Sequence, residues 1–134
     1  MAKSIAVQTI LDGYRNTVVK ITGYVNAEDY TNQSVVNIAN LSQIDAQGSK
    51  GTKLAVTEIN YDIEDAIQVD LIWGGGTPAA LWYGSGRGKV CAKDFGGITD
   101  NATTQDGTIL LTTKGGATGT TDLAFSIILE LVKT

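Results

Sequence analysis

Residues 122–133, "DLAFSIILELVK", decide the predicted fold because they fit two kinds of secondary structure. As a helix, the segment would be capped by Asp122 and would carry one apolar stripe, made of Leu123, Ile127, Ile128, Leu131 and Val132. As a strand, it places its apolar side chains on a single face without interruption, at Leu123, Phe125, Ile127, Leu129 and Leu131. The neighbouring segments alternate like strands, and the preceding Gly- and Thr-rich residues suit a hairpin. We therefore predict a strand.

Other windows alternate apolar and polar residues with the period of a strand that has one face in the core. They are residues 17–25, 53–63 and 67–73. The last two are separated only by "EDA", which predicts a hairpin. Turn signals such as "GGGTP" and Asp106-Gly107 lie between the windows at spacings that suit about eight or nine short strands. The pattern predicts an all-β fold, an antiparallel β-sandwich that is jelly-roll-like.

The chain length is sufficient for one domain. A protein of 134 residues buries roughly two thirds of its unfolded surface, so we assign residues 1–134 to a single β domain. Residues 1–12 form an N-terminal arm or an edge strand of this domain. The arm contains the strand-like sequence "SIAVQTI", and an extended terminus can add a strand to a neighbouring protein. Ser4, Ile5 and Val7 are therefore candidate interface residues.

Charge and residue types exclude several classes of protein. The 14 acidic and 10 basic side chains give a net charge of −4, and Lys and Arg do not cluster, so we expect no nucleic-acid partner. No apolar run resembles a signal peptide or a membrane span, so we expect synthesis in a cytosol and no membrane association. Histidine is absent and Cys91 is the single cysteine. We predict no catalytic residue, metal or cofactor, and we expect Cys91 to be a small buried hydrophobe.

The segment "YGSGRGKVCAKDFGG", residues 83–97, has the look of a nucleotide-binding loop. The phosphate-binding loop pattern requires Gly where Tyr83 stands and Ser or Thr where Val90 stands, so both ends fail. The triplet Asp94-Phe95-Gly96 lacks the His-Arg-Asp loop that a protein kinase needs, and we interpret it as a chance match. The glycines predict a mobile or tightly bent surface loop between the strands "ALWY" and "KVCA", with Arg87 exposed on it.

Acidic and aromatic residues give further candidates. Four carboxylates surround the predicted hairpin, and we interpret them as a solvated turn: Asp62, Glu64, Asp65 and Asp70. Trp73 is in phase with the apolar residues of its strand and is predicted to be buried. Trp82 and Tyr83 are adjacent, so their side chains point to opposite faces of a strand and one of them faces outward. Trp82, Tyr83 and Arg87 complete the set of candidate interface residues.

Two long segments carry a resemblance to a known group of proteins. They are "TILDGYRNTVVKITGY" near the start, and "KDFGGITDNATTQDGTILLTTKG" followed by "DLAFSIILELVK". They resemble small virion structural proteins of tailed bacteriophages, especially marine and cyanobacterial ones. The resemblance implies a β-rich decoration or cement protein on the capsid surface, synthesised in the host cytoplasm. It further implies the major capsid protein as partner and a homo-oligomer, most simply a trimer.

Other functions remain open from the sequence. Head, neck and tail proteins of this size share such β folds, so a tail or neck protein is one alternative. A carbohydrate-binding β-sandwich module is another, since an exposed Trp82 or Tyr83 could stack on a sugar. A hydrolase with two carboxylates would need one acid with a raised pKa in a cleft.

Overall fold

The computed structural model describes residues 2–134, so Met1, the first residue of the predicted arm, lies outside the described residues. Strands hold 63% of the residues and helices 7%, which confirms the all-β prediction. The helices are three short 3-10 turns, η1 (Ile38–Asn40), η2 (Lys93–Phe95) and η3 (Gly116–Thr118). Within the described part of the chain, no helix has the length and apolar character needed to cross a membrane.

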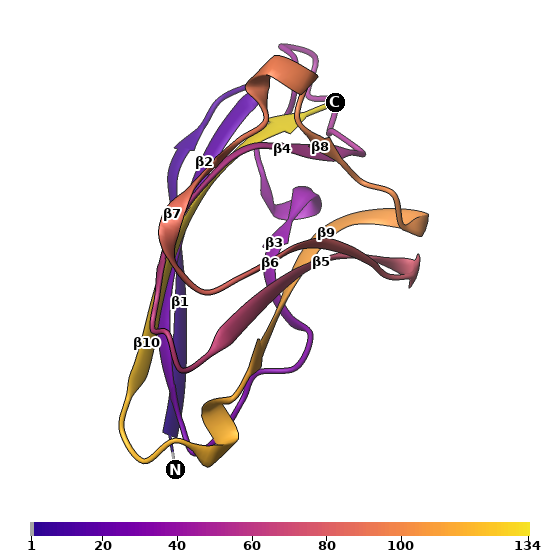
Figure 1. The fold of residues 1–134 in the computed structure, drawn as a ribbon. Coiled ribbons are helices and arrows are strands. Elements are labelled where there is room, and N and C mark those ends of the chain that lie inside the picture. The colour runs from indigo at the N-terminus through magenta and orange to yellow at the C-terminus, as the bar shows by residue number, and fades with distance from the viewer. Residues whose placement is uncertain (1) are drawn as a thin grey trace.

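Two antiparallel sheets pack face to face (Figure 1). The large sheet has the order β1 (Ala2–Asp12), β2 (Asn16–Asn26), β10 (Leu123–Lys133), β4 (Leu54–Ile63) and β7 (Gly86–Cys91). The short strand β8 (Ile98–Thr99) also pairs with β4. The small sheet has the order β3 (Gln33–Asn37), β9 (Thr103–Lys114), β5 (Gln68–Thr77) and β6 (Ala79–Gly84).

The strand order is that of a jelly roll with one additional strand. Without β1, the large sheet reads β2-β10-β4-β7 and the small sheet reads β3-β9-β5-β6. The two orders match position by position, because β2 leads to β3, β9 to β10, β4 to β5 and β6 to β7. The chain therefore moves from one sheet to the other at most connections, as in a jelly roll. The predicted sandwich is confirmed, and β1 extends the large sheet at its β2 edge.

The segment that decided the prediction is the central strand of the large sheet. β10 pairs with β2 on one side and with β4 on the other. Phe125, Ile127, Leu129 and Leu131 are buried, whereas Ile128 and Val132 of the helical stripe lie half-buried on the outer face. The strand prediction is confirmed, because two paired neighbours satisfy the backbone of β10 and the apolar alternation matches the core.

The core lies between the two sheets, as the alternating windows predict. Ile67, Val69, Leu71 and Trp73 are all buried, and Trp73 has no exposed surface. In β4 the alternation changes phase, since Val56 and Ile59 both face the core. A bulge in the pairing of β4 with β10 explains the change, because one extra residue shifts the side-chain phase of a strand.

The predicted hairpin between residues 53–63 and 67–73 is wrong. Its two strands, β4 and β5, belong to different sheets. Ile63 and Ile67 flank the turn that crosses between the sheets, and both side chains are buried in the core. The crossing turn is held by the N–H of Ile67, which donates to the carbonyl of Glu64 at 3.2 Å.

The glycine-rich segment is mostly strand rather than loop. β6 runs to Gly84 and β7 begins at Gly86, so Ser85 alone connects the two sheets there. Gly86 has φ +72°, a conformation that a side chain disfavours, and this allows the sharp bend. Gly88 leaves room for a neighbouring side chain, since a Cβ there would lie 2.7 Å from the Tyr61 hydroxyl.

Two residues have the opposite exposure to the one predicted. Cys91 is exposed, because it lies on the outer face of the edge strand β7 while Val90 turns toward the core. Asp70 is buried instead of lying in a solvated turn, because it lies within β5. The Lys114 Nζ lies 3.2 Å from its Oδ2, and Gln68 Nε2 donates to its Oδ1 at 2.6 Å.

Candidate functional site

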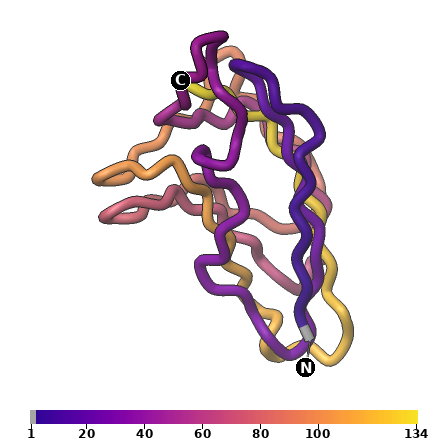
Figure 2. Tube along the Cα trace, turned by 180° about the vertical axis from the view of Figure 1, so that it is seen from behind, coloured from indigo at the N-terminus to yellow at the C-terminus, as the bar shows by residue number. Residues whose placement is uncertain are grey.

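β1 is an edge strand that projects beyond the small sheet. Among the described residues it pairs with β2 alone, and the opposing sheet ends at β3, the strand that corresponds to β2 (Figure 2). The predicted interface residue Ile5 lies half-buried against the core, while Ser4 is exposed. Val7 pairs with the core residue Ile21 yet remains 44% exposed. The inner face of β1 therefore carries an apolar pair, Ile5 and Val7, that the rest of the chain leaves partly uncovered.

A glycine lets β1 lie close to the core. Gly23 of β2 stands opposite Ile5, and a Cβ at Gly23 would overlap the Ser4 carbonyl oxygen. The same Cβ would lie 2.8 Å from the Phe125 ring. The absence of a side chain at this position therefore sets the contact between the edge strand and the body of the sandwich.

An ion pair between the fully buried Lys133 and the partly exposed Asp12 fixes the end of β1. Lys133 Nζ lies 2.6 Å from Asp12 Oδ1 and donates to the Ser42 carbonyl at 3.1 Å. The Ser42 N–H and hydroxyl both donate to the Asp12 carboxylate, at 2.8 and 2.9 Å. Burial raises the pKa of Asp12, but the hydrogen bonds from Lys133 and Ser42 outweigh it and hold this pKa below its usual value. The pair joins β1, the last strand and the segment after η1.

Exposed apolar side chains gather where β1 turns into β2. A bulge between Thr9 and Leu11 interrupts the pairing just before this turn. Ile10, Leu11 and Tyr14 are 53%, 52% and 53% exposed, and Phe95 of η2 is 83% exposed. We call these four residues the hairpin patch: Ile10, Leu11, Tyr14 and Phe95.

A surface depression lies between Leu11 of the hairpin patch and the residues on either side of Phe95. Its volume is about 430 Å³, and it is lined by Leu11 and Arg15 from the hairpin and by Lys93 and Gly96 on either side of Phe95. The outer face of the large sheet forms its floor, with Val18, Glu130 and Val132. The patch thus combines apolar side chains with basic and acidic groups around one hollow, a composition typical of protein-binding surfaces.

A carboxyl pair lies at the edge of this depression. Glu58 and Glu130 stand opposite each other on β4 and β10. A hydrogen bond from the Glu130 carboxyl, together with Lys89, lowers the pKa of Glu58 to about 2, and the same contact with Glu58 raises the pKa of Glu130. Lys89 Nζ lies 2.9 Å from Glu58 Oε1, and Lys93 Nζ lies 3.4 Å from Glu130 Oε1.

The carboxyl pair differs from the arrangement in a glycosidase. There the two carboxyl groups stand at least about 5 Å apart to leave room for the reacting sugar carbon or a water. Here each of the two groups has a lysine partner, and Glu58 also accepts a hydrogen bond from Asn60. This arrangement is a charge network that joins neighbouring strands on the outer face of the sheet.

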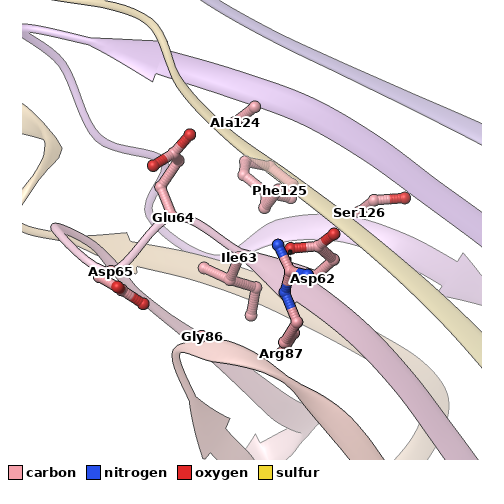
Figure 3. A pocket seen from close by; sticks show the side chains of 9 residues that line it. All are labelled: Asp62, Ile63, Glu64, Asp65, Gly86, Arg87, Ala124, Phe125 and Ser126. Atoms are coloured by element: carbon pink, nitrogen blue, oxygen red, sulfur yellow. Dashed lines mark ion pairs between the residues drawn. The ribbon is translucent and has the colours of Figure 1, made fainter.

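A second depression, of about 580 Å³, lies at the turn between β4 and β5 (Figure 3). Asp62, Glu64 and Asp65 give it a negative charge, and Arg87 stands beside Asp62 with 3.8 Å between Nε and Oδ1. The Arg87 and Asp62 side chains are both largely exposed, so the surrounding water weakens this ion pair. Glu64 and Asp65 occupy a solvated turn, as the sequence predicts, whereas Asp62 is exposed on the outer face of β4.

The structure separates the predicted aromatic and basic interface residues. Tyr83 lies opposite Asp70 on the outer face of the small sheet, whereas Arg87 lies opposite Asp62 on the outer face of the large sheet. Tyr83 is 55% exposed, and Trp82 is half-buried with its ring centroid 4.8 Å from that of Tyr61. Trp82 and Tyr83 thus point to opposite faces as predicted. Together with Arg87, they do not form one contact surface.

The hairpin patch was missed by the sequence reasoning, although a signal was present. The pair Ile10-Leu11 breaks the alternation of "SIAVQTI" just before Asp12-Gly13, as a bulge at the end of an edge strand does.

No group of three or more acidic or cysteine side chains in residues 2–134 is arranged to hold a metal ion. A scan against protein-family models finds no match to this chain, and a search of the curated proteins finds none.

Proposed function

We propose that this chain is a structural protein of a tailed-phage virion, a decoration or cement protein that binds the outer surface of the assembled head. Its partner is the major capsid protein. Two observations support the proposal: the resemblance carried by the segments around "TILDGY" and "DFGGITDNA", and a jelly-roll fold, which recurs in viral capsid and lectin domains. The fold by itself is compatible with many functions, so we infer the function from the surface.

The hairpin patch is the observation that carries the proposal. Exposed large apolar side chains are few in this chain, and of the six among the described residues only Val7 and Tyr83 lie outside the patch. Clustered apolar side chains around a hollow mark an interaction surface, whereas scattered ones need no explanation. Arg15 and Lys93 beside the hollow add positive charge that can pair with acidic groups of a partner. We assign the capsid contact to this patch.

The stabilising effect follows from binding equilibrium. A protein that binds only the assembled shell shifts the assembly equilibrium by RT ln(1 + [L]/Kd) at each site. Contacts of modest strength are sufficient, because they are repeated over the whole shell. No reaction is needed for this function, so the chain requires only a rigid scaffold and one complementary surface.

The test uses phage particles from which the protein is absent. Purified protein is added back, and binding to the particles and their resistance to heat are measured. We expect particles with bound protein to release DNA at a higher temperature. The variant Leu11→Asp/Tyr14→Asp places charges in the hairpin patch and should abolish decoration, while Tyr83→Asp, on the other sheet, should leave it unchanged.

The outcomes distinguish the alternatives. If Tyr83→Asp abolishes binding and the double variant does not, the contact surface is the Tyr83 face and the assignment to the hairpin patch is wrong. If labelled protein is found only at the tail or the neck, the chain is a structural protein of that part. Particles without the protein that match wild type in heat resistance would refute the cement function.

A further inference from the structure

We propose that β1 is also the contact between two copies of this chain, which pair along their free β1 edges in antiparallel orientation around a two-fold axis. The proposal is independent of the capsid, since it concerns the purified protein. It assigns the predicted interface residues Ser4, Ile5 and Val7 to a second copy, and leaves the hairpin patch for the capsid.

The four edges of the two sheets differ in how they are protected against pairing. β7 is six residues long and carries Arg87 and Lys89 in its middle. β3 has five residues, and β6 has six and follows Pro78; the pairing of each contains a bulge. Short length, central charges, proline and bulges are the features that prevent edge strands from adding another strand. Each of these three edges therefore carries at least two of them.

β1 has little of this protection. It is 11 residues long, its only charged residues are Lys3 and Asp12 near the two ends, and no strand among the described residues pairs with its free side. Its one bulge, between Thr9 and Leu11, lies at the far end and leaves residues 3–9 regular. Alternate backbone N–H and C=O groups of this stretch point away from β2 and can accept another strand.

The side chains of β1 favour a second copy as the occupant. Ile5 and Val7 lie on the inner face of β1, because they stand opposite inner-face residues of β2. A two-fold axis at Ala6 and perpendicular to the sheet places Ile5 opposite Val7 of the second copy, twice by symmetry. These β-branched pairs cover the exposed part of Val7, and such cross-strand contacts are favourable in sheets.

The antiparallel orientation keeps like charges apart. In that orientation Lys3 faces Thr9 of the second copy, and the Lys3 end of each strand lies toward the Asp12 end of the other. A parallel arrangement would place the two Lys3 side chains next to each other. Because the two-fold contact uses the same surface of both copies, it closes as a dimer, in place of the trimer that the resemblance implies.

The decisive experiment uses charges at the symmetry axis. Ala6 is exposed and faces itself in the proposed pair, so Ala6→Lys brings two positive charges together and Ala6→Glu two negative ones. We expect sedimentation velocity to show a dimer for the wild type and a dissociation constant at least about tenfold higher for each variant alone. An equimolar mixture of the two variants should restore the dimer, because opposite charges then meet.

A matched control and a second measurement complete the test. Ala124→Lys introduces the same charge at an exposed alanine of the central strand β10 and should leave the dimer intact. Ala6→Cys in a Cys91→Ser background should form a disulfide between copies, because directly opposite residues of an antiparallel pair are close enough for one. A monomeric or trimeric wild type, variants that dimerise normally, or a mixture that stays monomeric would each overturn the proposal.

Discussion

Removal of the Asp12 carboxylate should leave a buried positive charge without its partner. The Lys133 side chain has no exposed surface, and its Nζ lies 2.6 Å from Asp12 Oδ1. Breaking a buried pair by removing one member costs about 3–5 kcal/mol. Two oxygens of Ser42 still accept hydrogen bonds from Lys133 in Asp12→Ala, so we expect the lower end, about 3 kcal/mol. For a domain of this size that loss lowers Tm by about 10 °C.

The matched variant Lys133→Met separates the charge from the packing. Methionine has a similar length without the charge, and Asp12 keeps its hydrogen bonds from Ser42 and some exposure to water. We expect a cost of about 1 kcal/mol for this variant. In the double variant Asp12→Ala/Lys133→Met no charge remains unpaired, so its stability should exceed that of Asp12→Ala alone. Urea unfolding of the four proteins measures these differences.

The acid dependence of stability gives an independent check. The pKa of Asp12 is lower in the folded protein than its usual value of 3.8. The contribution of Asp12 is therefore complete above that value and is lost as the pH falls through the lower folded pKa. Asp12→Ala should lose this part of the acid dependence. Additive effects of the two single substitutions, or a loss of less than about 1 kcal/mol in Asp12→Ala, would refute the assigned role of the pair.

Three further predictions concern other parts of the molecule. Contact with Glu58 raises the folded pKa of Glu130, so the stability of the wild-type protein should fall as the pH rises through that pKa. Glu130→Gln should remove this fall, which Tm measured from about pH 4 to about pH 8 would show. Gly23→Val should cost at least about 2 kcal/mol in urea unfolding, because the side chain would collide with β1, while Gly13→Ala should cost little. Calorimetry with ATP and magnesium should show no heat, since the glycines of residues 84–89 lie in β6 and β7 and no α-helix follows them; saturable micromolar binding would contradict this.

The predicted contact residues had mixed outcomes in space. Ser4, Ile5 and Val7 were chosen because their segment has the pattern of a strand, and they do lie together on the free edge strand. Tyr83 and Arg87 are near each other in the sequence, but the chain crosses between the sheets at Ser85, so they lie on opposite outer faces. Lys93 and Leu11 are far apart in the sequence and line one depression. Proximity along the chain was therefore a poor guide to the surface.

The sequence by itself predicted most of the alternating strands and the side of them that faces the core, although most of its turn signal "GGGTP" lies within β5 and Asp106-Gly107 lies within β9. Alternation is a local property: a side chain points opposite to its immediate neighbours whatever the rest of the chain does. The segment at 122–133 and the window at 67–73 were therefore predicted correctly, and β4 changed phase only where a bulge interrupts it.

Only the tertiary structure decided which strand belongs to which sheet and which strands lie at an edge. These properties depend on pairings between residues far apart in the sequence, and alternation is identical for a central strand and an edge strand. Asp70 had the wrong predicted exposure for this reason, because its ion-pair partner Lys114 lies on the neighbouring strand β9. Asp12 and Lys133 are 121 residues apart, and their ion pair exists because β1 and β10 both flank β2, which no local pattern records.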